Sequence, residues 1–284
     1  MNQEVFTALS RALERGESVA LVTIVKAEGS TPQRVGAKML VFADGRTVGT
    51  IGGGCYENDA FGKAREALAL ARPSTVRYDL SDDFAEDSGL VCGGQMEVYI
   101  EPIEPAPQLY LIGAGHVAFH LARFAHAVGF GIHVIDDRAK FANADRFPDA
   151  SEVVVDSIPD WLHGAQLPAN AYVVIVTRGH RHDLEALRAL AARDLRYLGL
   201  IGSRAKVKRT YDELIAQSMP PECLRRVYAP IGLAIGAVTP EEIAVSILAE
   251  LIAVKYGKIS REQDDRQHGT PVSMSWTPKE IRNV

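Results

Sequence analysis

Residues 109–138 read LYLIGAGHVAFHLARFAHAVGFGIHVIDDR, and this stretch decides the fold of the C-terminal part of the chain. An apolar run at 109–112 has the length of a buried strand, and it leads directly into the glycine pattern G-x-G-x-x-A. Apolar residues then recur at helical spacing as far as Gly129, and a second apolar run at 132–135 ends at Asp136. A strand, a glycine turn, a helix and a second strand in this order are typical of a βαβ dinucleotide-binding unit.

The glycine turn predicts a site for a phosphate group. Gly113 permits the tight turn, Gly115 lets a pyrophosphate approach the backbone, and Ala118 is small enough for the helix to pack closely on the strand. The start of the following helix brings free N–H groups and a partial positive charge that favour an anion, and His116 and Val117 are candidate cofactor-binding residues here. We therefore expect a cofactor phosphate to bind at this turn.

Asp136 lies 23 residues after Gly113, where an acidic side chain commonly meets a ribose hydroxyl. Asp136 favours an unphosphorylated ribose, but the neighbouring Arg138 leaves that preference open. A Rossmann unit that binds no dinucleotide is the alternative interpretation, because a fold alone does not specify a ligand.

The composition narrows the class of protein. A length of 284 residues suggests two domains, and an apolar content of 47% is enough for a large core. The net charge of −5 gives no general reason to expect nucleic-acid binding, and no apolar run is long enough to span a membrane. The first 17 residues resemble an amphipathic helix and not a signal peptide, and three cysteines do not suggest a disulfide framework. We therefore expect a cytoplasmic protein with reduced thiols.

Residues 1–104 predict a smaller α+β domain around an unusual cysteine. Strand-like runs alternate with turns up to residue 51, and Cys55 then follows three glycines, of which Gly53 and Gly54 are nearest to it. A helix is expected to begin just after Cys55, where the helix dipole favours the thiolate, which is both the nucleophile and the ligand of soft metals. The glycines would let a bulky ligand approach the backbone.

A second cysteine, Cys92, also adjoins a glycine pair, in the segment VCGG. Each cysteine alone could be a small buried core residue. Two glycine-flanked cysteines in one domain favour a functional role, whereas Cys223 has no such setting and is interpreted as structural. The proline-rich segment at 101–108 predicts a linker, and we place the domain boundary after residue 104.

Residues 105–284 continue to alternate strands with helices, which predicts a mostly parallel, Rossmann-like sheet covered on both faces. Its last helix should begin with a capping box at Thr239, and the polar residues after 259 are expected to be mobile. Ligands bind off the carboxyl ends of such strands, where three loops collect. Beyond the residues already named, the candidate cofactor-binding residues of these loops are Thr177, His180, Gly202, Ser203 and Arg204.

The loop after the fourth strand of this sheet carries the sequence RGHRHD at 178–183, and we expect a helix only from Leu184. His180, His182 and Asp183 could bind a metal or transfer a proton, but a short loop offers poor metal geometry. A helix cap or a polar ligand contact is the favoured role for Asp183.

The motifs together resemble the xanthine dehydrogenase accessory protein family, XdhC/CoxI, over nearly the whole chain. The matching segments are GSTPQRVGAKM, GGGCYE, VCGG, GAGHVA, VIDDR, TRGHRHD, LGLIGSRAK and APIGLAIGAVTPEEIAVSILAEL, in this order. The resemblance implies a chaperone that binds the molybdenum cofactor, molybdopterin, supports its sulfuration by a cysteine desulfurase and passes it to a xanthine-dehydrogenase-type apoenzyme. It also implies that Cys55 and Cys92 handle sulfur and molybdenum, with Cys55 as the metal ligand, and we expect a homo-oligomer. One departure is Ala234, where relatives carry an acid, which weakens any catalytic role for that loop.

Two other functions remain open at this point. The first is an NAD(P)-dependent oxidoreductase in which Cys55 or His180 assists the redox chemistry. The second is a scaffold that joins a cysteine desulfurase to its client enzyme without binding the cofactor itself.

Overall fold

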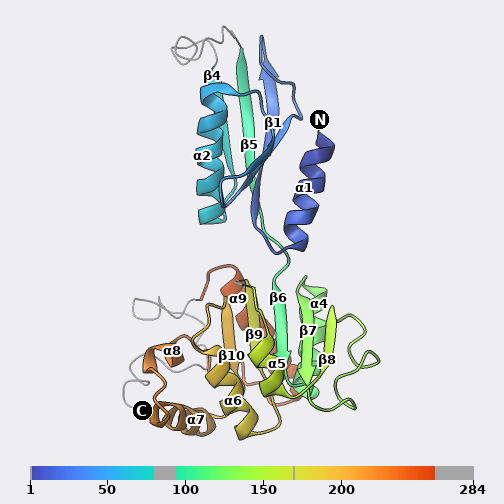
Figure 1. The fold of residues 1–284 in the computed structure, drawn as a ribbon, viewed down its shortest axis with the longest axis vertical. Coiled ribbons are helices and arrows are strands. Elements are labelled where there is room, and N and C mark those ends of the chain that lie inside the picture. Colours follow the sequence, from blue (N-terminus) through green and yellow to red (C-terminus); the bar gives the residue numbers. More distant parts are fainter. Residues whose placement is uncertain (1, 80–93, 169, 260–284) are drawn as a thin grey trace. The chain divides into compact units, whose positions relative to one another are not determined.

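A computed structural model describes residues 2–79, 94–168 and 170–259. The chain divides into two compact units, Met1–Ala106 and Pro107–Val284, which are described separately below (Figure 1). The expected fold class is confirmed, because the first unit mixes helices with an antiparallel sheet and the second contains a parallel five-stranded sheet. Cys92 and the tail expected after residue 259 lie outside the described residues.

Within residues 2–79 and 94–106, the N-terminal unit is a five-stranded antiparallel sheet with α1 on one face and α2 on the other (Figure 1). Its strand order is β3-β2-β1-β5-β4. Its elements are α1 (Asn2–Glu14), β1 (Val19–Glu28), β2 (Lys38–Phe42), β3 (Thr47–Gly49), α2 (Gly54–Leu70), β4 (Ser74–Asp79) and β5 (Gln95–Ile103).

Each helix of this unit buries a narrow apolar stripe against the sheet. Ala60, Ala64 and Ala67 of α2 recur every third or fourth residue and are buried against alternate residues of the central strands. On the opposite face, Val5 and Ala12 of α1 are buried against the other set of strand residues. Small alanines let α2 approach the sheet closely, which fixes the position of its first turn and therefore of Cys55.

The prediction of a linker at 101–108 is wrong for residues 101–103, which belong to a strand. Strand β5 continues to Ile103, and it pairs with β1 through Leu21–Glu101, Ala20–Pro102 and Val19–Ile103. The proline content indicated a linker, but proline lacks only one donor and is tolerated near a strand end. Strand β4 was not expected at all, although its half-buried Val76 and Tyr78 alternate with exposed residues as in an edge strand.

The C-terminal unit is built on a parallel sheet of order β10-β9-β6-β7-β8. Strand β6 lies at the centre, and the chain order reverses between β6 and β9. The elements are β6 (Gln108–Ile112), α4 (His116–Ala127), β7 (Gly131–Asp136), β8 (Glu152–Val155), α5 (Ile158–Gly164), β9 (Ala171–Ile175), α6 (His180–Leu190), β10 (Tyr197–Leu200), α7 (Arg204–Ala216), α8 (Pro221–Arg225) and α9 (Pro240–Lys255).

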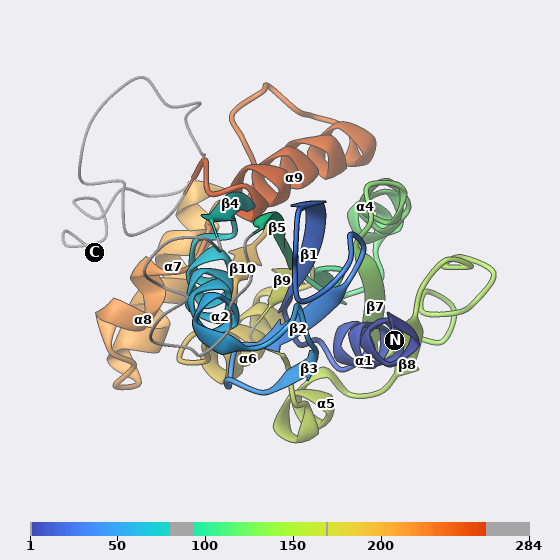
Figure 2. The same cartoon turned by 90° about the horizontal axis from the view of Figure 1, so that it is seen from above.

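Both faces of this sheet are covered, as Figure 2 shows for α4 and α9 on one side and α5 and α6 on the other. Strand β6 is buried from Leu109 to Ile112, and successive residues point to opposite faces. Leu109 and Leu111 belong to the core beneath α4 and α9, whereas Tyr110 and Ile112 belong to the core beneath α5, α6 and α7. An uninterrupted apolar run is therefore what this central strand requires.

Helix α9 begins as expected. The Thr239 hydroxyl accepts a hydrogen bond from the Glu242 N–H at 3.3 Å, and the Glu242 carboxylate accepts from the Thr239 N–H at 2.9 Å. This reciprocal capping box confirms the sequence prediction.

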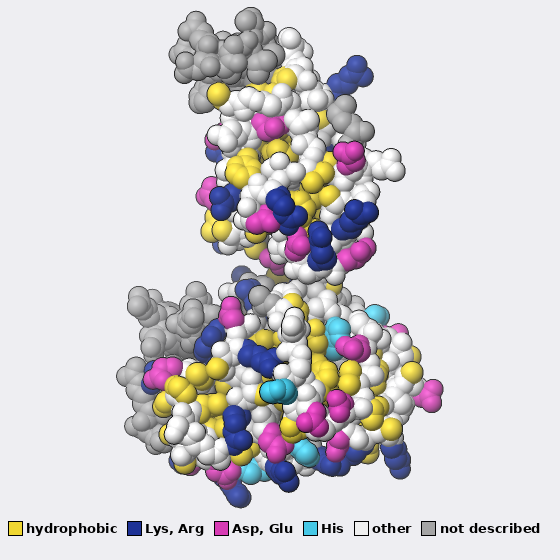
Figure 3. All heavy atoms as spheres, in the orientation of Figure 1, with side chains coloured by type: hydrophobic (Ala, Val, Ile, Leu, Met, Phe, Trp, Pro, Cys, Tyr) yellow, Lys and Arg dark blue, Asp and Glu magenta, His cyan; other side chains and the backbone are white. Residues whose placement is uncertain are grey.

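The surface is charged and mixed. On the face drawn in Figure 3, basic and acidic side chains are interspersed over both units, in keeping with a net charge of only −5. Among the helices of the described residues, none is both long enough and apolar enough to cross a bilayer.

Candidate functional site

The turn after β6 lies against the end of β9, at the point where the strand order reverses. Gly113 has a φ of 110°, and its N–H donates to the Ile135 carbonyl at 2.7 Å. A methyl group on Gly113 would lie 2.6 Å from the Val176 carbonyl oxygen. Only glycine fits both this conformation and this close approach, so the turn sits directly at the edge where parallel sheets bind ligands.

Gly115 leaves the first turn of α4 uncapped. It occupies the N-cap position with an extended backbone, and no side chain accepts the N–H groups that follow it in the described part of the chain. A methyl group on Gly115 would meet nothing within 4 Å. His116 is exposed, and the side chain of Val117 packs on the core, so Val117 can offer a ligand only its backbone. An uncapped helix start beside open space is a suitable site for a phosphate.

Asp136 is buried, and hydrogen-bond donors of the protein itself bind its carboxylate. Its oxygens accept hydrogen bonds from the Ala114 N–H at 2.8 Å and from the N–H, Nε and Nη2 groups of Arg138 at 3.0, 2.8 and 2.9 Å. Burial alone would raise the pKa of Asp136, but the Arg138 guanidinium and the two backbone N–H groups outweigh it and lower the pKa to about 2. The ionised Asp136 carboxylate thus connects the end of β7 to the glycine turn.

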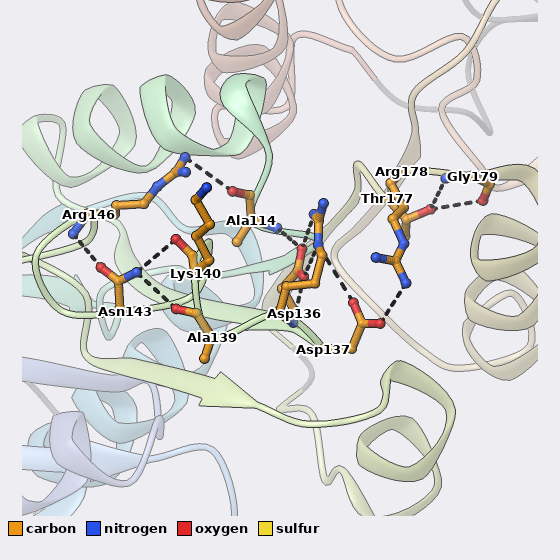
Figure 4. A network of polar contacts seen from close by, with 11 residues as sticks. Ala114, Asp136, Asp137, Ala139, Lys140, Asn143, Arg146, Thr177, Arg178 and Gly179 are labelled. Atoms are coloured by element: carbon orange, nitrogen blue, oxygen red, sulfur yellow. Dashed lines mark hydrogen bonds and ion pairs between the residues drawn. The ribbon is translucent and has the colours of Figure 1, made fainter.

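Further arginines surround this connection, as Figure 4 shows. Arg178, from the loop after β9, forms an ion pair with Asp137 at 2.8 Å. Arg146 donates to the Ala114 carbonyl at 3.3 Å, and its guanidinium lies 5.0 Å from the ring centre of Phe141. The sequence pattern placed the loop of Arg178 at this edge without assigning a role to that arginine, and nothing local indicated that the loop of Arg146 returns to it.

Residues 180–183 are helical, in contrast to the sequence prediction, and only Arg178 and Gly179 of the segment 178–183 remain in the loop after β9. Helix α6 begins at His180, four residues earlier than expected, because Gly179 serves as its N-cap. Asp183 therefore does not cap the helix. Its buried carboxylate accepts a hydrogen bond from the Thr177 hydroxyl at 2.6 Å and pairs with Lys206 Nζ at 2.5 Å.

His180 connects α6 to α7. Its Nε2 lies 2.9 Å from a Glu213 carboxylate oxygen, and its Nδ1 lies 3.2 Å from the Thr210 hydroxyl. The ion pair with Arg209 and the hydrogen bond with His180 lower the pKa of Glu213. His180 is thus engaged on both ring nitrogens and reinforces the contact between the two helices.

The remaining candidate residues lie at the start of α7. Ser203 is its N-cap, and the hydroxyl accepts from the Lys206 N–H at 3.3 Å. Gly202 is half-buried, and Arg204 is exposed. The predicted residues from 113 to 204 in this unit therefore share one edge of the sheet, whereas no group of three or more His, Cys, Asp or Glu side chains in the described part of the chain could hold a metal ion.

The glycine turn before Cys55 belongs to the N-terminal unit and has its own internal anion. Gly52, Gly53 and Gly54 have φ values of 131°, 80° and 79°, which only glycine adopts easily in succession. The Glu57 carboxylate accepts from the N–H groups of Ile51, Gly52 and Gly53 at 2.8, 3.1 and 3.0 Å and from the Thr50 hydroxyl at 2.5 Å.

These four donors have an electrostatic consequence for Glu57. Partial burial alone would raise its pKa, but the hydrogen bonds outweigh burial and lower it. The sequence analysis did not assign a role to this residue, although an acid in the first turn of a helix after a glycine turn is a recognisable signal.

Cys55 lies in the first turn of α2 and is exposed. The turn that carries it also contacts the loop at 29–36, because a methyl group on Gly52 would lie 2.9 Å from the Pro32 ring. The structure thus brings together two segments that the sequence singled out separately. Cys223 belongs to the C-terminal unit, where it is half-buried and packs against that unit's own core, as a structural cysteine does.

Comparison with known protein families identifies the chain. Residues 109–251 match the XdhC Rossmann domain, and residues 12–79 match the XdhC and CoxI family. The chain belongs to the XdhC and CoxI family. Membership covers both units in the order that the sequence motifs predicted.

Individual relatives agree with this membership. The chain is 36% identical over 252 residues to the uncharacterized protein YqeB of Escherichia coli K12, and it spans 46% of that protein's length. It is 27% identical to a probable xanthine dehydrogenase component of Bacillus subtilis 168, with 88% of this chain and 97% of the relative covered. It is 22% identical to the molybdenum cofactor insertion chaperone PaoD of Escherichia coli K12, with 89% and 87% covered.

A solved structure is similar over nearly the whole chain. The chain aligns with the crystal structure of a xanthine dehydrogenase from Bacillus halodurans with a TM-score of 0.50 and 27% identity, over 95% of this chain and 99% of that one.

Proposed function

We propose that this chain is an accessory protein of a xanthine-dehydrogenase-type enzyme, and that it binds the molybdenum cofactor and delivers it to that enzyme. The observation that carries the proposal is the family match over the Rossmann domain, joined to an uncapped, glycine-lined helix start at the carboxyl edge of the sheet. Two relatives, one named as part of a xanthine dehydrogenase and the other as a molybdenum cofactor insertion chaperone, support the same role.

The Rossmann unit would hold the phosphate end of the cofactor. The N–H groups at Gly115, His116 and Val117 precede the hydrogen-bonded part of α4 and can donate to phosphate oxygens. Arg178 and Arg146 add positive charge around the same turn. Molybdopterin carries a phosphate, so this edge has the chemistry that one end of the cofactor requires.

In the N-terminal unit, we propose Cys55 as the thiol that handles sulfur and molybdenum. Its side chain is exposed at the start of a helix, and thiolate sulfur is a suitable ligand for a soft or thiophilic metal centre. We also propose Cys92 for this role, on its glycine-flanked sequence alone, and a cysteine desulfurase as the partner that sulfurates the cofactor while it is held.

Pterin extraction tests the proposal. The full-length protein is purified from molybdate-replete cells, and the bound pterin is oxidised and quantified by fluorescence. A stoichiometric amount supports the proposal. Bound nicotinamide with turnover of a reducible substrate would replace it with the oxidoreductase alternative, and intact capture of the client enzyme without pterin would replace it with the scaffold.

Variants assign the two ends of the cofactor. Gly115→Val should reduce the pterin content, because its branched side chain fills the open space before α4, whereas Gly164→Val, at an open glycine before β9, should not. Cys55→Ser should reduce pterin retention and client activation, and Cys223→Ser is the matched control. If all four proteins retain the parent's pterin content, both assignments are wrong.

A further inference from the structure

The corner between the β6–α4 turn and the end of β7 has a chemistry that is unusual for a dinucleotide site. In such sites the carboxylate of an acid at the end of the second strand accepts hydrogen bonds from the hydroxyl groups of a ribose. Here that acid is Asp136, and four N–H groups from Ala114 and Arg138 already bind its carboxylate. A carboxylate has about four acceptor positions, so Asp136 has none left for a ribose.

The second acid of this corner is also engaged. Asp137 pairs with Arg178 at 2.8 Å and lies 3.8 Å from Arg138 Nε. Two further cationic side chains near the turn, Lys140 and Arg146, can only donate hydrogen bonds. Figure 4 shows these groups around Ala114, with more cations than carboxylates. A ligand oxygen in this corner therefore meets donors and an excess of positive charge.

Arg138 is held in a fixed position within this corner. Two of its five N–H groups bind the Asp136 carboxylate, and its guanidinium lies 4.0 Å from the ring centre of Phe141. The other N–H groups have no hydrogen-bond acceptor in the parts of the chain that the structure describes. An arginine that is oriented by one anion and still has free donors is prepared to bind a second anion.

We infer that this corner binds a terminal phosphate monoester rather than an unphosphorylated ribose, and that Arg138 is the residue that sets this preference. The inference rests on the proposed role of the turn in phosphate binding and makes it specific. The monoester could be the terminal phosphate of the pterin or the 2′-phosphate of a nucleotide, and the experiment below distinguishes these two sources.

Titration of the full-length protein with NADP+ and NAD+ tests the inference, because the two probes differ only in a 2′-phosphate. NADP+ should bind about tenfold more tightly, as expected for one added set of charge-assisted hydrogen bonds. Arg138→Met should abolish this difference. The matched control is Arg123→Met, which removes another arginine near an aromatic ring, on the exposed surface of α4, and should leave the difference unchanged.

If the methionine variant does not fold, Arg138→Lys replaces it in the same titration. It keeps the charge but loses the bidentate fork, so the preference should fall without disappearing. Equal affinity of the parent for both probes, or no binding of either, overturns the inference.

The form of the co-purified pterin tests the other source. Acid hydrolysis of a dinucleotide form releases a nucleoside monophosphate, whereas the monophosphate form releases none. We expect none, and stoichiometric release would overturn the inference. Pterin present without a preference for NADP+ would leave the proposed function standing, and the preference without pterin would leave only the inference.

Discussion

The two glycine turns of this protein solve one problem in opposite ways. Each turn precedes a helix and presents several backbone N–H groups. Before α2, the Glu57 carboxylate binds three of these groups from four to six residues along the chain. Before α4, Asp136 binds only the Ala114 N–H, from 22 residues away, and the helix start remains uncapped. The Glu57 carboxylate thus binds three consecutive N–H groups ahead of α2, whereas Asp136 binds one ahead of α4, and neither helix has a side-chain cap in the described residues.

This difference teaches that a glycine turn before a helix is not in itself a binding site. What decides its use is where the nearest carboxylate comes from. A local acid closes the turn and shapes the backbone that carries Cys55, whereas an acid from the next strand fixes the turn and leaves the donors beyond it unused.

Gly113→Ala should have the largest effect, because it removes the conformation on which the open turn depends. Its methyl group would lie 2.6 Å from a backbone oxygen at a φ of 110°. We expect a loss of about 3 kcal/mol in the free energy of unfolding, against about 1 kcal/mol for Gly129→Ala, which has a φ of 89° and open space. Urea unfolding followed by tryptophan fluorescence measures it, since Trp161 and Trp276 both lie in the second unit. Equal losses in the two variants would show that β9 can move away from the turn.

The second-largest effect is expected from low pH, which should lower the free energy of unfolding by protonating Asp136. The pKa of Asp136 falls from 3.8 to about 2 on folding, so its stabilising contribution is complete above pH 4 and is lost as the pH falls towards 2. The contribution is about 2 kcal/mol, and it should be absent from Asp136→Asn at every pH. Urea unfolding between pH 5 and pH 2.5 measures it, with the exposed Asp145→Asn as the control. Parallel pH profiles for the parent and Asp136→Asn would contradict the assignment.

Glu57→Gln probes the closed turn. The amide keeps one oxygen but loses the charge that three N–H groups share, so we expect a loss of about 1 kcal/mol and faster amide hydrogen exchange at residues 51–53. Glu66→Gln, on the exposed side of the same helix, should change neither quantity. Unchanged exchange in Glu57→Gln would mean that the glycine backbone holds the turn unaided.

Gly115→Ser should convert the open turn into a capped one, with the smallest effect on stability. The backbone of Gly115 is already extended, and a serine side chain has room there. The hydroxyl can accept an N–H group of α4, which should add about 0.3 kcal/mol and compete with a bound phosphate. Thermal unfolding together with pterin content checks both effects. A gain in stability with undiminished pterin would place the phosphate elsewhere.

Most of the fold could be predicted from sequence because its signals are local. The run at 109–112, the glycine spacing and the capping box at Thr239 each define a structure within a few residues. The errors occurred where tertiary pairing overrides local preference. Pro102 indicated a linker, but pairing with β1 extends β5 through it, and the start of α6 at His180 is set by Gly179 rather than by the apolar residues further on.

The candidate site was predictable in its position but not in its electrostatics. The carboxyl edge of a parallel sheet follows from the order of strands and helices. The pairing of Asp136 with Arg138 occupies the carboxylate that Asp136 alone would offer to a ligand, and it depends on side-chain geometry that spacing does not encode. Arg146 and Arg178 reach the same turn from distant loops, with no periodic signal to reveal them.

The pairing of α4 with α9 has a consequence for synthesis. The apolar face of α4, including Leu121 and Ala125, is buried with Ala244, Ile247 and Leu251, which lie more than 100 residues later in the chain. While a ribosome is still making the intervening strands, the helix that begins at the glycine turn has no cover for this face. The second unit therefore completes this hydrophobic core only after α9 has been synthesised. Truncation before Pro240 should yield an aggregation-prone product.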